Sequence, residues 1–205
     1  KDWIRTIKGH NTNINDLKFK EGDACNFSLF AETTDKLIIF ATNGRFYTIS
    51  CDKLPGGRGH GDPLRLMIDL EDGHGILDMF IFKGNRSFII ASDAGRGFRI
   101  NEKDLIAQTK TGKQILNLKL KEESSIIHAI GENHDHVAAI SSKRKLLVFN
   151  INELPTMTRG KGIRLQKYTN GGFASLTTLK LSEGLTWKTN TGIRVEKNIS
   201  SWVGK

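Results

Sequence analysis

Two stretches of the sequence align without a gap at an offset of 100 residues, and together they decide the fold. The first is DKLIIFATNGRFYTISCDKLP (35–55) and the second is DHVAAISSKRKLLVFNINELP (135–155). In each stretch, short apolar runs flank a turn-forming group, and the last two residues are Leu-Pro. A middle copy, NRSFIIASDAGRGFRINEKDL (85–105), aligns once one residue is inserted at its turn. The chain is therefore built from a repeat of about 50 residues.

The rest of the sequence continues this alternation of short strand-like runs and turns. Runs such as ILDMFIF (76–82) and ILNLKL (115–120) are bounded by turn signals such as EDGHG (71–75), and helical periodicity is nearly absent. A four-stranded unit of this length suits the blade of a propeller, which buries its faces only against neighbouring blades. We therefore predict an all-β fold, a closed or broken β-propeller (a β-pinwheel) of about five four-stranded blades.

We expect one domain over residues 1–205, with partial copies of the repeat at both ends. The repeats are expected to span about residues 1–34 (partial), 35–84, 85–134, 135–172 and 173–205 (divergent). The sequence begins at Lys1 without Met and ends abruptly, so we expect this domain to be excised from a longer protein.

The charge balance points to a polyanionic partner. The 205 residues include 31 Lys+Arg against 22 Asp+Glu, which gives a formal net charge of +9. Nucleic acid is the most common partner of such a domain, although a soluble protein with a basic face shows the same balance. No apolar run is long enough to span a bilayer, and no basic amphipathic helix indicates a membrane surface. The two cysteines, Cys25 and Cys51, form no C-x-x-C motif, which fits a reducing cytosol and gives no support to a metal or disulfide framework.

A basic, glycine-containing loop follows the aligned stretch within each repeat. The three versions are GGRGHGDPLRL (56–66), AQTKTGKQILNL (107–118) and TMTRGKGIRL (156–165). Because the motif recurs once per repeat, it does not mark a single catalytic site. Glycine permits positive φ and close backbone approach, and a row of basic loops on a rim would touch successive phosphates of a duplex without reading its sequence. The alternative is a set of glycine turns with solvated cations.

Several segments, in order from about residue 2 to 165, resemble one known family. They include DWIRTIKGHN (2–11), SDAGRGFRI (92–100) and KLLVFNINELP (145–155). They are similar to the C-terminal domain of the A subunit of bacterial topoisomerase IV and of its relative gyrase. The resemblance implies a broken β-propeller whose outer rim binds and bends duplex DNA, the segment that is passed through the cleaved one. The gyrase box, Q-R-R-G-G-K-G, has no intact copy here, which favours topoisomerase IV and argues against strong wrapping.

The resemblance also implies which cations face DNA. The loops between strands supply one group, which is Arg58, His60, Arg65, Lys110, Lys113, Arg159, Lys161 and Arg164. The hairpin turns supply a second group, which is Arg45, Arg96, Arg99, Lys143, Arg144 and Lys145. Lys8 and His10 occupy the matching KGH loop of the first partial copy. No catalytic or metal-ligating residue is expected in this chain.

The implied role is non-catalytic within a larger enzyme. The family works as an ATP-dependent type II DNA topoisomerase, an isomerase that decatenates and relaxes DNA during chromosome segregation. The implied partners are double-stranded DNA, the N-terminal breakage-reunion region of the same polypeptide, and the B subunit of topoisomerase IV in a heterotetramer. ATP and Mg would be used by the holoenzyme, with no cofactor in this domain. The expected location is the cytoplasm, at the nucleoid or peripherally at the membrane. The alternatives are a gyrase domain that wraps DNA for negative supercoiling and a propeller scaffold that binds protein.

Other candidate sites favour ordinary structural roles. His134 and His136 flank Asp135 with strand alternation, but no third metal ligand is evident, and two solvated histidines are expected. Tyr47 lies inside a repeat strand, where Leu147 is its counterpart, so packing explains it better than a covalent link to DNA. The acidic residues near strand ends are interpreted as rim charges that limit self-association, and they are Asp69, Glu71, Asp72 and Asp78.

Overall fold

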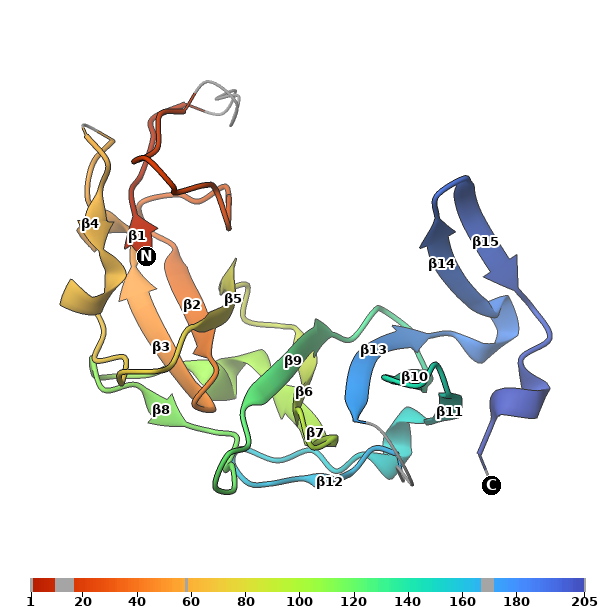
Figure 1. The fold of residues 1–205 in the computed structure, drawn as a ribbon. Helices are drawn as coiled ribbons and strands as arrows, with labels where there is room; N and C mark the ends of the chain where they lie inside the picture. The colour runs from red at the N-terminus through yellow and green to blue at the C-terminus, as the bar shows by residue number, and fades with distance from the viewer. Residues whose placement is uncertain (1, 10–16, 58, 167–171, 205) are drawn as a thin grey trace. The chain divides into compact units, whose positions relative to one another are not determined.

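The computed structural model describes residues 2–9, 17–57, 59–166 and 172–204. Its regular structure consists of β-strands and short 3-10 helices (Figure 1). The chain divides into two compact units, one made of Lys1–Gly84 with Glu102–Ile115 and the other of Asn85–Asn101 with Leu116–Lys205. Among the helices in the described ranges, none has the length and apolar character needed to cross a membrane.

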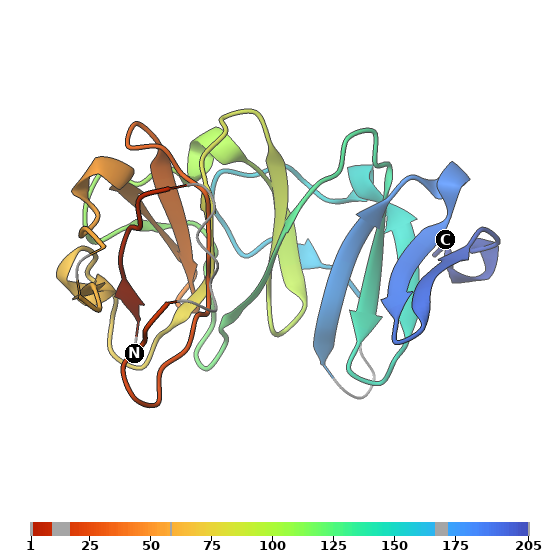
Figure 2. The same cartoon turned by 90° about the horizontal axis from the view of Figure 1, so that it is seen from above.

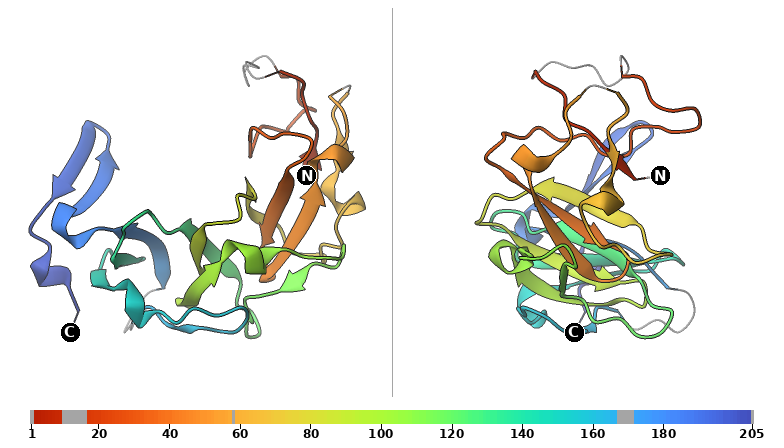
Figure 3. Two further views of the ribbon diagram at one scale, coloured as in Figure 1. Left: turned by 180° about the vertical axis from the view of Figure 1, so that it is seen from behind. Right: turned by 90° about the vertical axis from the view of Figure 1, so that its left-hand side faces the viewer.

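The first unit is centred on a four-stranded antiparallel sheet. Its strand order is β5-β2-β3-β8, and the strands are β2 (Lys36–Ala41), β3 (Arg45–Ser50), β5 (Ile76–Ile81) and β8 (Lys113–Gln114). The outer strand β8 is contributed by the following repeat and runs past the start of β3 (Figures 1 and 3). A two-stranded sheet joins β1 (Trp3–Ile4) to β4 (Asp62–Pro63). The 3-10 helices are η2 (Cys51–Lys53), η3 (Leu64–Leu66) and η4 (Glu102–Leu105).

The inner strand β2 is buried on both faces, which explains its continuous apolar run. Residues 37–41 are all buried, as expected for a strand that has neighbours on both edges and packing on both faces. Tyr47 on β3 is fully buried in a cluster with Leu37 and Ile68, and its hydroxyl donates to the Asp69 carbonyl oxygen at 3.4 Å. The prediction that packing explains Tyr47 is confirmed.

The second unit contains two larger sheets and a hairpin. One sheet has the order β12-β7-β6-β9, with β6 (Ser87–Ser92), β7 (Arg96–Asn101), β9 (Ser124–Ala129) and β12 (Ile163–Arg164). The other has the order β11-β10-β13, with β10 (His136–Ser141), β11 (Leu146–Asn150) and β13 (Phe173–Leu179). The hairpin pairs β14 (Leu185–Thr189) with β15 (Gly192–Glu196). The 3-10 helices are η5 (Ile151–Glu153), η6 (Leu181–Glu183) and η7 (Ser200–Trp202).

Apolar residues between the sheets form the core of the second unit. Ile89 and Ala91 of β6 belong to the same buried cluster as Val137 and Ala139 of β10. A second cluster joins Val148 of β11 to the segment that follows β13, so the hairpin lies beside the three-stranded sheet (Figure 2). The two larger sheets of the second unit therefore pack face to face, as neighbouring propeller blades do.

The predicted all-β, propeller-like fold class is confirmed, and the strand counts add detail to it. Two sheets reach four strands, one has three, and the terminal sheets have two within the described residues. In both four-stranded sheets the outer strand comes from the next repeat: β8 pairs with β3, and β12 pairs with β7. A sheet therefore does not coincide with one repeat of the sequence.

Candidate nucleic-acid interface

Three basic loops, which we call the docking loops, lead into the outer strands β4, β8 and β12. They are residues 56–61, 107–112 and 156–162. The last glycine of each, Gly61, Gly112 or Gly162, has positive φ, at 88°, 69° and 67°. A Cβ atom on Gly112 would lie 2.7 Å from the Phe46 carbonyl oxygen, and the other two would overlap backbone of the strand alongside. These glycines therefore dock the outer strand onto its neighbour.

The Leu-Pro ends of two repeats make an equivalent contact. The Pro55 carbonyl oxygen accepts a hydrogen bond from Thr6 N at 2.8 Å, and the Pro155 carbonyl oxygen accepts one from Arg99 N at 2.9 Å. Each of these two docking loops is thus held by a hydrogen bond before it reaches its outer strand.

In each four-stranded sheet, the docking places a predicted cation of the hairpin turn opposite a residue of the outer strand. In the first sheet, Arg45 lies opposite Gln114 of β8, and its Nη1 donates to the Thr111 carbonyl oxygen at 3.1 Å. In the second sheet, Arg96 lies opposite Arg164 of β12. The hairpin turn and the docking loop therefore form one edge surface, which we call the docked edge.

An acidic loop binds two of the predicted cations. Glu71 Oε1 lies 3.8 Å from Arg45 Nε. Arg65 donates to the carbonyl oxygens of Leu70 and His74, at 2.5 and 2.8 Å, and lies 3.6 Å from Asp72. Residues 70–74 therefore neutralise positive charge that the family resemblance assigned to DNA binding.

Two more predicted cations are half-buried and hold the backbone. Arg99 Nε donates to the Leu154 carbonyl oxygen at 2.8 Å, and Lys113 Nζ donates to the Asp104 carbonyl oxygen at 2.6 Å. Lys110 and Arg159 are exposed, and each makes a single side-chain hydrogen bond of 3.3 Å. Spare donors on these last two remain available to a ligand.

The remaining predicted cations have no side-chain partner among the described residues. Arg96 is half-buried, and the exposed members of this set are Lys8, His60, Lys143, Arg144, Lys145, Lys161 and Arg164. Arg144 has φ of 59° in the turn between β10 and β11, where the equivalent turn residues are Gly44 and Gly95, with φ of 78° and 72°. The three-stranded sheet β11-β10-β13, which we call the third sheet, therefore keeps an arginine in a backbone conformation that favours glycine. His10 and Arg58 lie outside the described residues.

Arg5 was not among the predicted cations, yet it organises the first docking loop. Its Nη1 donates to the Gly59 carbonyl oxygen at 2.7 Å, and its Nη2 donates to the Lys18 carbonyl oxygen at 2.8 Å. The guanidinium also lies 5.5 Å from the Phe19 ring centre. The repeat alignment gave no signal for it because the first copy lacks the strand pair that sets the register of the others.

The expectation of two solvated histidines is wrong for His136, which is buried at the start of β10. Its Nδ1 lies 2.8 Å from Asp135 Oδ1. That hydrogen bond, together with the Leu181 backbone N–H, lowers the pKa of Asp135. The alternation pattern could not reveal this burial because β10 is the inner strand of its sheet.

Three polar side chains meet between β9 and β13. The Thr178 backbone N–H donates to His128 Nε2 at 3.3 Å, and the Thr178 hydroxyl lies 2.8 Å from His134 Nδ1. Burial, and then the charge of His134, lower the pKa of His128. His128 is therefore held as a neutral acceptor. In the described parts of the chain, no three His, Cys, Asp or Glu side chains are grouped to hold a metal ion.

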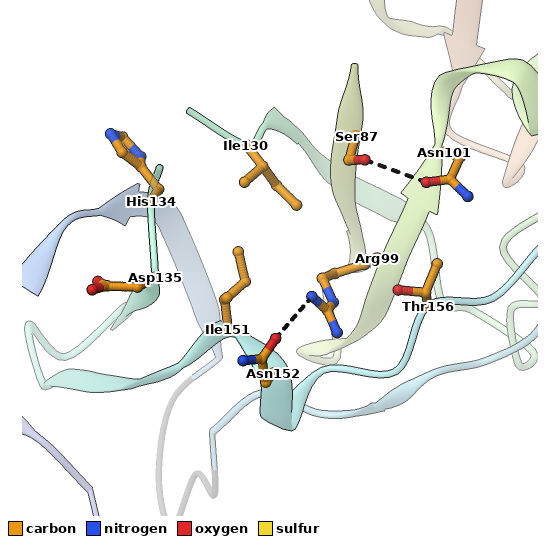
Figure 4. A pocket seen from close by; sticks show the side chains of 9 residues that line it. All are labelled: Ser87, Arg99, Asn101, Ile130, His134, Asp135, Ile151, Asn152 and Thr156. Carbon is orange, nitrogen blue, oxygen red and sulfur yellow. Dashed lines mark hydrogen bonds between the residues drawn. The ribbon is translucent and has the colours of Figure 1, made fainter. Parts of the chain in front are cut away.

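A cavity of about 340 Å³ lies in the second unit between β7 and η5. Figure 4 shows Ile130, Ile151 and Arg99 around it, with the Arg99 guanidinium bonded to Asn152 and the Asp135 carboxylate turned away. No described nucleophile is paired with a base here. The free thiol of Cys51 is buried, and burial raises its pKa, so it is unreactive.

Comparisons with known proteins agree with this geometry. The family described as DNA gyrase C-terminal domain, beta-propeller, matches residues 35–83, 86–130 and 135–181. The A subunit of DNA topoisomerase 4 from Caulobacter vibrioides is 44% identical over 204 residues, covering 99% of this chain and 26% of that protein. The corresponding protein of Rickettsia felis is 39% identical over 203 residues, covering 99% and 27%. The chain thus spans about a quarter of the length of these relatives.

A solved structure extends the agreement to three dimensions. The Escherichia coli ParC C-terminal domain matches with a TM-score of 0.87 at 26% identity, covering 100% of this chain and 86% of that one. The repeats that the family model matches are the ones that build the three larger sheets. This chain belongs to the family of DNA gyrase C-terminal β-propeller domains, as a homologue of the C-terminal domain of the topoisomerase IV A subunit.

Proposed function

We propose that this chain binds and bends duplex DNA on its docked edges and hairpin turns, as the non-catalytic C-terminal domain of a topoisomerase IV A subunit. The observation that carries the proposal is the convergence of cations from two separate sequence groups at one edge of a sheet. Arg96 and Arg164 lie at directly opposite positions there, and Lys161 lies in the docking loop that leads into β12. Cations gathered without acidic partners attract a polyanion.

The strained turn of the third sheet supports the same function. Lys143, Arg144 and Lys145 are consecutive exposed cations, and Arg144 holds a left-handed conformation. That conformation costs an L-residue about 1–2 kcal/mol relative to glycine. Strain of this kind persists where a side chain has a use, and here the use is a contact with phosphate.

The contacts would position DNA without reading its bases. The cations lie on turns and short edge strands, and no described helix of suitable length is present to enter a major groove. If about five phosphates are neutralised, the logarithm of the binding constant falls with the logarithm of salt at a slope of about −5. Binding that ignores salt would contradict the proposal.

The topoisomerase relatives support a proposed role within a larger enzyme. The chain would hold the transport segment for ATP-dependent decatenation and relaxation by a heterotetramer with the topoisomerase IV B subunit, in the cytoplasm at the nucleoid. The breakage-reunion region of the same polypeptide, ATP and Mg would supply the chemistry outside this chain. Wrapping as in gyrase is disfavoured because no docking loop carries an intact gyrase box. Ligation of a nicked plasmid separates the two, since strong wrapping would leave the product supercoiled.

The decisive experiment compares two sets of four charge reversals. The edge set is Lys143, Arg144, Lys145 and Lys161, each changed to Glu. The control set lies at the opposite ends of the strands and is Lys36, Lys53, Lys83 and Lys103, all exposed. Both sets change the net charge equally. Gel-shift titration should show binding abolished by the edge set and largely kept by the control set, with both variants folded by circular dichroism. Equal losses of DNA affinity in the two sets would show that binding depends on net charge alone, which would contradict the proposed surface.

A further inference from the structure

Two arginines face each other across the edge of the second four-stranded sheet. Arg164 of β12 is the direct antiparallel partner of Arg96 of β7. Side chains at directly opposite positions lie on the same face with their Cβ atoms about 4.5–5.5 Å apart, and like charges there are destabilising. A folded sheet with this pairing therefore lacks a negative charge at this point.

The residues that the structure describes do not supply that charge. Within the described ranges, Arg5, Arg45, Arg86, Arg96 and Arg99 are the half-buried arginines, and every one except Arg96 has a partner within the protein. Arg164 is exposed, and no described carboxylate pairs with it or with Arg96.

The register cannot shift to separate the two guanidinium groups. A side chain on Gly162 would overlap the Gly97 backbone, and one on Gly97 would overlap the Ile90 carbonyl oxygen. Leu165 is buried in the core, and its N–H donates to the Gly95 carbonyl oxygen at 2.9 Å. A slip by one residue would expose Leu165 and break this packing.

In the first four-stranded sheet, the arginine at this position has a neutral residue opposite and a carboxylate beside it. At the equivalent positions, Arg45 faces the neutral Gln114, and Glu71 lies beside it. Of these two sheets, only the second leaves the position open to an external anion.

We propose that Arg96 and Arg164 together hold a single phosphate group of the DNA backbone. Two guanidinium groups on one face match the paired oxygens of a phosphate, each giving charge-assisted hydrogen bonds. The proposal rests on the proposed function for the source of the phosphate, because free inorganic phosphate has the same chemistry. Lys161, three residues before Arg164, would contact a neighbouring phosphate.

The test uses Arg96→Gln, Arg164→Gln and the double variant of the full chain, with Lys103→Gln at the other end of β7 as the control. Each single variant should weaken binding of a duplex about tenfold and reduce the salt slope by about one. The double variant should lose little more than either single one, because both residues hold the same phosphate. Lys103→Gln should bind as the wild type does.

A second arm removes DNA and follows thermal stability at low ionic strength. Arg164→Gln should melt above the wild type without an anion, because the repulsion is relieved. Inorganic phosphate should raise the melting temperature of the wild type and leave that of the double variant nearly unchanged. Equal protection of both would mean a general ionic effect and would overturn the paired site.

The two arms also separate this proposal from the proposed function. If the wild type binds DNA and the arginine variants bind equally well, the phosphate site is wrong and the proposed function stands. If the wild type binds no DNA, but inorganic phosphate raises its melting temperature and not that of the double variant, the site takes a free anion and the proposed function fails.

Discussion

The sheets β5-β2-β3-β8 and β9-β6-β7-β12 have the same arrangement of strands, with a central hairpin and an outer strand docked through a glycine. They differ in the charge that faces the arginine at their docked edge. Arg45 in the first is held beside Glu71, whereas Arg96 in the second faces Arg164. Alignment of the repeats places both arginines on the edge. Whether each is available to a ligand depends on a loop that the alignment does not place beside it.

The largest expected effect concerns the glycine that docks the second sheet. Gly162→Ala should lower the free energy of unfolding by at least about 2 kcal/mol, because left-handed backbone alone costs about 1–2 kcal/mol and overlap with Gly97 adds to it. Gly112→Ala should cost less, because the nearest atoms would lie 2.7 Å from its Cβ, whereas a Cβ on Gly162 would lie still closer to the Gly97 carbonyl oxygen. Urea unfolding measures both. Gly56→Ala, with open space around its Cβ, is the control, and an equal loss there would contradict the docking role.

A double substitution should convert the first sheet to the state of the second. Glu71→Gln with Gln114→Arg releases Arg45 and gives it an arginine opposite, so one more phosphate contact is expected. DNA affinity at about 0.1 M salt should rise about tenfold. The control for charge is Glu132→Gln with Asn85→Arg. These two exposed residues lie after β9 and before β6, at the end of the second sheet opposite its docked edge. A gain of the same size in the control would show that position is irrelevant.

In the third sheet we expect a smaller effect, in which stability rises while DNA affinity falls. Arg144→Gly restores the residue that the other two hairpin turns carry. Stability should rise by about 0.5 kcal/mol, since relief of about 1–2 kcal/mol of strain exceeds the about 0.5–1 kcal/mol of added chain entropy. DNA affinity should fall severalfold. Lys143→Gly removes the same charge without positive φ and should lose stability, and calorimetry distinguishes the two.

The smallest expected effect is a pH dependence that arises from His128 in the second sheet, at the position that Phe80 holds in the first. Burial lowers the pKa of His128 in the folded state, so the unfolded chain takes up its proton first as pH falls. Stability should be full above the unfolded pKa of about 6.5 and decline below it. His128→Phe should flatten that decline between about pH 7 and 5, and His60→Gln, at an exposed loop, should not.

The sequence was sufficient for the fold class, because the repeat offset and the turn residues are local signals. It was not sufficient for strand pairing across repeats. Alignment shows that residues 113–114 and 163–164 occupy matching positions, but not that each pair completes the sheet of the preceding repeat. Likewise, Arg65 reads as a free loop cation, although three-dimensional folding places the carbonyl groups of residues 70–74 around it. His136 was misjudged for the same reason, since burial depends on which strand is innermost.

The division of the chain has a consequence for how the protein can be taken apart. The backbone leaves the first unit after Gly84, returns after Asn101 and leaves again after Ile115. A single cut at any of these three points separates at least one unit from strands of its own sheet, either β8 or the β6–β7 hairpin. Proteolytic nicking or truncation at these points should therefore never release both units intact. Any continuous stretch that contains the whole of one unit also contains a segment of the other.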